Sequence, residues 1–330
     1  MTAESIYGGI SFSIIIESEN LGTSDEAALL SALRGLDTQT LPIRNANEAV
    51  LVNTGDISGS VKQSIATEFP WISVLEQPDS LSYYEVKQTA ANHITGDVVL
   101  LCDCDIRYDK NWLAEMLKPF SDTPIQVVTG ETAIDANGPY SLFIQLFWCF
   151  PPHSRRRRPF PTRGYPANNV AFRRALLERF PIPAFPRLYR GNCSLHARLL
   201  ERNGIQTFKA PLAKAIHPII PPAHAPLRFF MWGHHEARIA QALHAGIKPG
   251  PTRLMRIVGS AITVLARRAV VPMMRIPSSM RKPSLILWLP VALALGTLAY
   301  SVFVFGMVVS LILPWIDLVR CGKWLERSRA

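Results

Sequence analysis

The chain has 330 residues, 48% of them hydrophobic, so it can bury the core of one large domain or of two smaller ones. Its five cysteines form no CxxC pair and no cysteine–histidine metal spacing, which excludes a disulfide framework and favours a reducing compartment. The net charge of +10 is unevenly divided: residues 1–150 carry 20 acidic and 7 basic residues, whereas residues 151–330 carry 5 and 28. The basic half predicts an anionic partner, either nucleic acid or a membrane surface.

Apolar, β-rich runs alternate with helical patterns through the first 130 residues. The predicted strands cover 11–18, 48–53, 72–77, 97–103 and 125–132. The predicted helices cover 24–36, 82–95 and 110–120, the first with Ser24 as its N-cap. This alternation predicts an α/β domain with a parallel, doubly wound sheet that binds its ligands at the carboxyl ends of the strands.

The middle of the chain is less regular. Residues 151–168 form a loop rich in proline and arginine, and helices are predicted at 175–180 and 194–204. The four arginines at 155–158 could guide an anionic acceptor towards a site, or they could be ordinary solvated charges of a loop.

The C-terminal part carries a membrane signal. Residues 283–316 contain no charged residue, whereas one membrane span needs about 20 apolar residues. We therefore expect a transmembrane segment with a basic tail over residues 283–330, as one tilted span or a short hairpin. Upstream, residues 253–275 mix arginines with apolar residues, which predicts a basic amphipathic helix in the membrane interface within residues 251–282; a core helix is the alternative. The membrane accounts for the basic half better than nucleic acid does.

The sequence around Asp103 carries the strongest chemical signal. An apolar strand ends at Asp103-Cys104-Asp105, so two carboxylates leave the sheet together at its carboxyl edge. A bend at the end of the strand can turn both towards one cation. Mg²⁺ and Mn²⁺ prefer oxygen ligands and also bind the oxygens of a diphosphate. The pair therefore predicts a site for a divalent metal.

The order of these segments resembles that of the family 2 glycosyltransferases, which have the GT-A fold. The matching pieces within residues 11–245 are SIIIESENL, EAVLVNTGD, YYEVKQTAANHITGDVVLLCDCDIRYDKNWL, NNVAFRR, LHARLLERNG, AIHPI and RFFMWGHHEARIAQAL. The resemblance implies a Rossmann-like, mostly parallel sheet with flanking helices over residues 1–250. It also implies an inverting transfer of sugar from a nucleotide-diphosphate donor, with Mn²⁺ or Mg²⁺ as cofactor. The acceptor stays open, with a lipid or a polysaccharide precursor as candidates.

The resemblance also assigns partners and site residues. It implies a nucleotide sugar as partner. The apolar and basic C-terminal part predicts membrane lipid as a second partner and no nucleic acid, and the cysteine pattern favours a catalytic domain on the cytoplasmic side of the membrane. Asp103 and Asp105 would hold the metal on the donor diphosphate, where it acts as a Lewis acid. His217 matches a further ligand position, or it is a loop histidine that packs beside Pro218.

Positions near the two substrates follow from the same matches. The donor positions are Glu17, Glu19, Asn20, Asn53, Thr54, Lys87 and Asp103, and the acceptor positions are Asn169 and Trp232. Asn53 and Thr54 stand where many members carry paired aspartates, so the nucleotide base stays open. Lys87 would lie near the donor phosphate, or it would be a solvated lysine on a helix surface.

The position of the catalytic base departs from the family pattern. Asn192 stands where inverting members carry an aspartate, and an amide does not accept a proton at neutral pH. Glu131 or His196 could be the base, or the protein could be a catalytically degenerate binder of nucleotide sugars. A nucleotidyltransferase is less compatible with the sequence, because no glycine-rich phosphate loop follows the first predicted strand.

Overall fold

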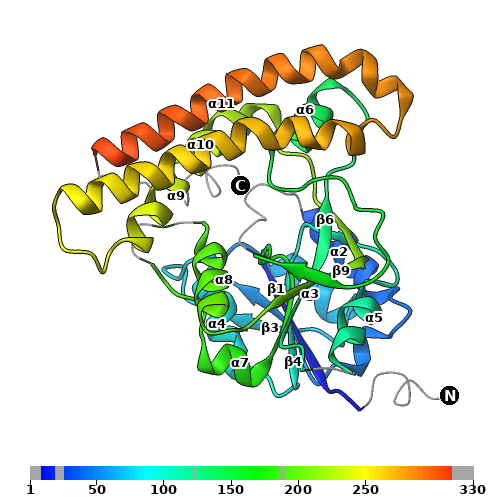
Figure 1. Ribbon diagram of the computed structural model, residues 1–330. Helices are drawn as coiled ribbons and strands as arrows, with labels where there is room; N and C mark the ends of the chain where they lie inside the picture. The colour runs from blue at the N-terminus through cyan, green and yellow to red at the C-terminus, as the bar shows by residue number, and fades with distance from the viewer. Residues whose placement is uncertain (1–8, 19–25, 122–123, 186–187, 189, 314–330) are drawn as a thin grey trace.

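The computed structural model describes residues 9–18, 26–121, 124–185, 188 and 190–313. A mixed β-sheet forms the centre of the molecule (Figure 1), in the strand order β3-β2-β1-β4-β8-β6-β9-β5 with β7 paired to β9. Its first half is parallel and consists of β1 (Phe12–Glu17), β2 (Ala49–Asn53), β3 (Ser73–Glu76) and β4 (Val98–Asp103). These four strands follow the predicted ranges to within one or two residues.

The second half of the sheet is mixed. It consists of β5 (Arg107–Tyr108), β6 (Val127–Ala133), β7 (Phe160–Thr162), β8 (Asn169–Arg173) and β9 (Thr207–Ile216). β8 runs antiparallel to both β4 and β6, while β6 and β9 are parallel. Of these strands the sequence predicted only β6. The predicted parallel sheet is confirmed for β1 to β4, whereas its continuation through β8, β6, β9 and β5 is mixed.

Helices cover both faces of the sheet. They are α2 (Glu26–Asp37), α3 (Gly59–Glu68), α4 (Tyr83–Ala90), α5 (Trp112–Leu117), α7 (Arg174–Arg179) and α8 (Asn192–Arg202). Ile14 and Ile16 of β1 belong to the core shared with α2, α3 and α5, whereas Ile15 belongs to the core shared with α4, α7 and α8. Because successive side chains of a strand point to opposite faces, a strand buried on both sides is apolar at every position. This explains why β1 and β4 are continuous apolar runs.

The remaining helices form a third apolar cluster on one side of the molecule. They are α6 (Pro139–Phe147), α9 (Ala225–Leu243), α10 (Pro251–Ser279) and α11 (Leu289–Ile312). Two segments, Pro251–Ser279 and Pro283–Ile312, are long and apolar enough to cross a membrane by length and composition alone. Figure 1 shows α10 and α11 running in opposite directions across the same side of the molecule. Within the described residues, the charge-free segment forms one helix after a short 3₁₀ turn (Pro283–Trp288), and not a hairpin of its own.

Two glycines bring the backbones of α9 and α11 into contact. A Cβ atom built at Gly233 would lie 1.9 Å from the carbonyl oxygen of Phe303, and one at Gly306 would lie 2.1 Å from that of Phe230. Small residues at such positions allow two helices to pack closely.

We expect Gly233→Ala to push α11 away from α9 and to lower the free energy of unfolding by about 1–3 kcal/mol, the usual cost of overpacking. Thermal unfolding of the full chain in detergent measures this change. Gly259→Ala on α10 is the matched control, because a Cβ there meets no atom within 4 Å. Alanine in place of glycine inside a helix is stabilising by about 0.5–1 kcal/mol. Equal unfolding temperatures for the two variants would contradict the close packing.

Candidate active site

The carboxyl ends of the parallel strands bring several predicted site residues to one edge of the sheet. Glu17 ends β1 and is paired with Asp103 at the end of β4, and Asn53 ends the neighbouring β2. A cavity of about 530 Å³ opens beyond Asp103. Asp105, Glu131 and His217 also line it. The sheet thus collects residues that lie far apart in the sequence.

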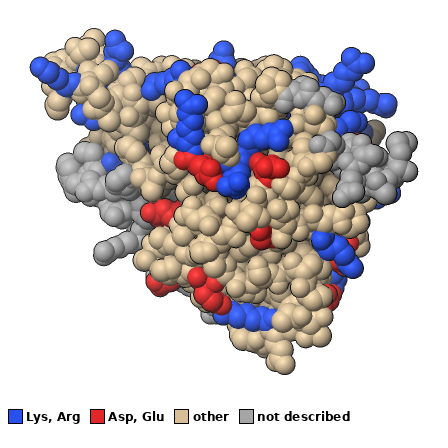
Figure 2. All heavy atoms as spheres, turned by 90° about the horizontal axis from the view of Figure 1, so that it is seen from below, with Lys and Arg blue, Asp and Glu red and all other residues tan. Residues whose placement is uncertain are grey.

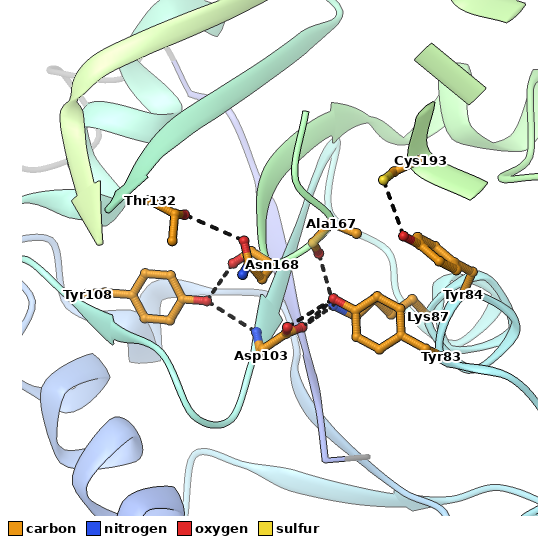
Figure 3. Close-up of polar contacts among 9 residues, drawn as sticks. All are labelled: Tyr83, Tyr84, Lys87, Asp103, Tyr108, Thr132, Ala167, Asn168 and Cys193. Atoms are coloured by element: carbon orange, nitrogen blue, oxygen red, sulfur yellow. Dashed lines mark hydrogen bonds and ion pairs between the residues drawn. The ribbon is translucent and has the colours of Figure 1, made fainter. Parts of the chain in front are cut away.

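A buried network holds Asp103 in place (Figure 3). The hydroxyl of Tyr83 donates to both carboxylate oxygens of Asp103, at 2.7 and 2.9 Å, and the ammonium group of Lys87 donates to one of them. The backbone N–H of Asp103 donates to the hydroxyl of Tyr108, which in turn donates to the backbone carbonyl of Asn168 at 2.7 Å. Asp103 is therefore oriented before any ligand binds.

Lys87 lies beside Asp103. Its side chain is fully buried, and its ammonium group donates to Asp103, to the hydroxyl of Tyr83 at 2.8 Å and to the carbonyl of Ala167 at 2.9 Å. An ammonium group has three N–H donors, so these contacts use all of them. The alternative of a solvated lysine is therefore wrong, and the contact of Lys87 with a donor phosphate stays a prediction. In the structure Lys87 balances the charge of Asp103.

The side chain of Asp105 has a buried oxygen atom, Oδ1, without a hydrogen-bond partner among the described residues. Burial raises the pKa of Asp105, the positive charge of His217 opposes this increase, and the neighbouring Asp103 adds to it. A cation would give this oxygen a partner and remove the repulsion between the two carboxylates. The described residues contain no group of three or more His, Cys, Asp or Glu side chains arranged for a metal. The oxygen donors of the pair fit a hard divalent cation that shares its remaining ligands with a substrate.

His217 lies at the same cavity, directly after β9. Its ring packs against Phe150 with 4.7 Å between the ring centroids, and its Nδ1 lies 2.6 Å from the carbonyl oxygen of Pro218. A carbonyl accepts, so Nδ1 carries the proton in this contact. The other ring nitrogen, Nε2, then has a free lone pair in the neutral ring, which is the form that ligates metals.

Glu131 lies on β6 and also faces the cavity. Its Oε2 atom accepts a hydrogen bond of 2.7 Å from the backbone N–H of Ser154, which belongs to the loop rich in arginine. The nearby Lys209 has its pKa lowered by burial, while the charge of Glu131 acts in the opposite direction. A carboxylate in this position can accept a proton from a molecule in the cavity.

Asn192 and His196 do not line the cavity. Asn192, the first residue of α8, is 1% exposed, and its Oδ1 atom has no partner among the described residues. His196 is fully buried: its Nδ1 accepts from the hydroxyl of Tyr165 at 2.5 Å, and its Nε2 donates to the carbonyl of Phe180 at 2.8 Å. Burial lowers the pKa of His196 to about 4. The structure thus removes His196 from the candidate bases and gives the predicted catalytic position Asn192 no access to the cavity.

Two predicted donor positions, Asn53 and Thr54, make hydrogen bonds that stabilise the loop after β2. Oδ1 of Asn53 accepts from the backbone N–H groups of Gly55 and Ile57, both at 3.1 Å, and its amide nitrogen donates to Glu76 at 2.7 Å. The hydroxyl of Thr54 donates to Asp56 at 2.6 Å. Asn53 and Thr54 therefore shape the turn after β2 and do not line the cavity. Glu19 and Asn20 lie outside the described residues.

The two predicted acceptor positions, Asn169 and Trp232, lie in different surroundings. Asn169 on β8 is fully buried, accepts from the indole N–H of Trp112 at 2.8 Å and donates to Thr132 at 3.1 Å. Its predicted role at the acceptor is not supported, because its side chain is used inside the core. The preceding residue, Asn168, lines the cavity, as does Trp232 on α9.

Two arginines at the cavity were not predicted. Arg190 lies over the ring of Tyr83, with 3.8 Å between its guanidinium carbon and the ring centroid. Arg268 of α10 lies 3.9 Å above the ring of Trp232 and pairs with Glu236 at 2.6 Å. The sequence of α10 indicated a basic amphipathic helix, in the membrane interface or in the core, and no local pattern connects residue 268 with a cavity beside β4.

Comparison with known proteins agrees with this architecture. The family described as Glycosyl transferase family 2 matches residues 24–180, and no curated protein sequence matches the chain. The mannosyltransferase PcManGT from Pyrobaculum calidifontis in complex with GDP-Man and Mn²⁺ has a TM-score of 0.60 at 16% identity, over 93% of this chain and 88% of that one. GalNAc-T7 with UDP, GalNAc and Mn²⁺ has a TM-score of 0.53 at 12% identity, over 76% of this chain and 54% of that one. Residues 24–180 thus match glycosyl transferase family 2, and the chain has a fold of the GT-A type, which together support glycosyltransferase activity.

Proposed function

We propose that the chain transfers a sugar from a nucleotide-diphosphate donor, with a divalent cation held by Asp103 and Asp105. The unpartnered, buried Oδ1 atom of Asp105 beside a second carboxylate is the observation that carries this proposal. The two similar solved structures, which contain GDP-Man or UDP together with Mn²⁺, support the same class of donor and metal.

Each side chain then has a defined task. The cation would take up negative charge on the leaving diphosphate. Tyr83 and Lys87 fix the orientation of the Asp103 carboxylate, and His217 could supply a further ligand through Nε2. Glu131 accepts the proton of the attacking acceptor hydroxyl, as an inverting transfer requires.

The walls of the cavity favour an acceptor with an apolar part. Beyond the carboxylates the lining includes Phe150, Ile219, Leu227, Met231 and Trp232. We therefore propose a lipid or a lipid-linked polysaccharide precursor as the acceptor.

We also propose that residues 1–250 form the catalytic domain, on the cytoplasmic side of a membrane to which α10 and α11 attach it. α10 carries Arg267 and Arg268 close to its middle. Each arginine would cost about 2.5–3.5 kcal/mol at the centre of a spanning helix. This cost favours an interfacial position for α10.

Thermal unfolding with nucleotides tests donor binding. We expect GDP or UDP to raise the unfolding temperature only together with Mn²⁺ or Mg²⁺, because the cation joins the diphosphate to the carboxylates. A nucleotide at 100 times its Kd would stabilise the fold by about 2.7 kcal/mol. If no nucleotide has an effect with either metal, the proposal fails.

A catalytically degenerate binder is the second candidate, because Asn192 replaces the usual base. It predicts the same stabilisation but no sugar transfer and no donor hydrolysis.

A further inference from the structure

One face of α11 is packed against the catalytic domain. Gly296 lies against the ring of Phe147 in α6, Phe303 and Gly306 touch the backbone of α9, and Ser310 bonds to His234 at 2.5 Å. These contacts run from Gly296 to Ser310, or about 21 Å along the axis of the 24-residue helix α11. α9 cannot follow α11 through a bilayer, because Trp232, His235 and Glu236 on α9 line the catalytic cavity.

α10 is held to the same domain by its basic side chains. Arg268 pairs with Glu236, and the guanidinium of Arg275 donates to three carbonyls at the end of α6, those of Gln145, Leu146 and Trp148. Lys282, in the turn after α10, pairs with Asp135 at 3.1 Å. Both long helices are therefore attached side-on, and neither projects away from the catalytic domain (Figure 1).

The opposite faces of both helices are apolar and exposed. The exposed positions of α11 are Val291, Leu298, Phe305, Val308 and Ile312, and those of α10 are Leu254, Met255, Val258, Ile262, Val270, Met273 and Met274. The connecting turn adds Ile286, Leu287 and Trp288. On α11 these positions recur every three, four or seven residues, so they form one stripe.

The charge around this apolar face has one sign. Residues 237–316 contain no acidic residue, while α10 carries Arg253, Arg256, Arg267, Arg268 and Arg275. On the side of the molecule away from α10 and α11, by contrast, acidic and basic side chains both occur (Figure 2). An apolar stripe flanked by arginines and free of acids matches one leaflet of an anionic bilayer.

We propose that α10 and α11 lie flat in one leaflet of an anionic membrane and do not cross it, so that both ends of each helix stay on the side of the catalytic domain. This inference rests on the membrane attachment proposed above and is independent of sugar transfer. For residues 283–313 it replaces the expected transmembrane segment by a platform that also covers the cavity, through Arg268. Residues 314–330 of the predicted segment lie outside the described residues.

Cysteine labelling of the full chain in sealed membrane vesicles tests the topology. Thr252→Cys reports the start of α10, Ser284→Cys the turn between the helices and Ser328→Cys the tail, each in a background with Cys149 and Cys321 replaced by serine. Thr67→Cys, at an exposed position of α3, reports on which side of the membrane the catalytic domain lies. We expect an impermeant maleimide to label all four sites from the same side. Labelling of residue 284 or 328 only after the vesicles are opened would overturn the proposal. Failure of the chain to remain with the vesicles in high salt would also overturn it, although nucleotide binding would persist.

Competition between vesicles with and without phosphatidylglycerol tests whether the arginines of α10 bind anionic lipid. The full chain is expected to prefer the anionic vesicles, and Arg256→Gln to reduce this preference about fivefold. Arg202→Gln, at an exposed position of α8, is the matched control and should leave the preference for anionic vesicles unchanged. Equal preferences for the parent and Arg256→Gln would contradict the role of the arginines.

Discussion

Asp105→Asn is expected to abolish the stabilisation by nucleotide and metal and to reduce sugar transfer at least about 1,000-fold. A metal contributes several kcal/mol to the stabilisation of leaving-group charge, and each 1.36 kcal/mol is a factor of ten in rate. The fold should stay intact. Burial raises the pKa of Asp105, so the folded state bears a cost for its charge that a neutral amide does not have. The unfolding temperature without ligand should therefore be unchanged or higher.

The matched control for this experiment is Asp109→Asn. Asp109 is exposed, does not line the cavity, and accepts a bond from the backbone N–H of Asn111 that an amide oxygen can also accept. Transfer rates and thermal unfolding with UDP or GDP and Mn²⁺ should match those of the parent in this control. If Asp105→Asn binds nucleotide and metal as the parent does, the metal site lies elsewhere.

Glu131→Gln is expected to lower the rate of sugar transfer about 10²–10⁴-fold while the affinity for the donor stays nearly constant. The amide keeps the size of the side chain and still accepts the bond from the N–H of Ser154, but it cannot take up a proton. Initial rates at saturating donor, together with nucleotide titrations, separate these two effects. Glu178→Gln, at an exposed position of α7, is the matched control and should transfer sugar at the parent rate. Transfer at the parent rate by Glu131→Gln would exclude Glu131 as the base.

Asn192→Asp distinguishes the enzyme from the degenerate binder. Because residue 192 is 1% exposed and does not line the cavity, a carboxylate there should cost stability without raising transfer. A parent without any transfer or donor hydrolysis, together with a gain in Asn192→Asp, would support the degenerate binder.

The sequence alone determined the first half of the sheet and the place of the Asp103–Asp105 pair at its carboxyl edge. β1 and β4 are largely apolar runs because both faces of the sheet are covered. Such a run can be recognised in the sequence without knowing which strands and helices pack against it. Asp103 and Asp105 follow such a strand directly, so their place at the carboxyl edge follows from the order of residues. β8 and β9 carried no comparable signal, because β8 has only five residues and β9 is interrupted by two lysines and a proline. Both strands pair with partners from distant parts of the chain.

Only the tertiary structure decided where individual side chains point. Lys87 binds Asp103 because α4 packs against the first strands of the sheet. Asn168 rather than Asn169 lines the cavity, and this difference depends on the register in which β8 pairs with β4. His196 is turned away from the cavity by Tyr165 and Phe180. The composition of α11 predicted a membrane helix, but only its packing on α9 showed that one of its faces belongs to the protein. Composition measures how apolar a segment is, whereas the choice between a bilayer and a neighbouring helix depends on which backbones approach closely.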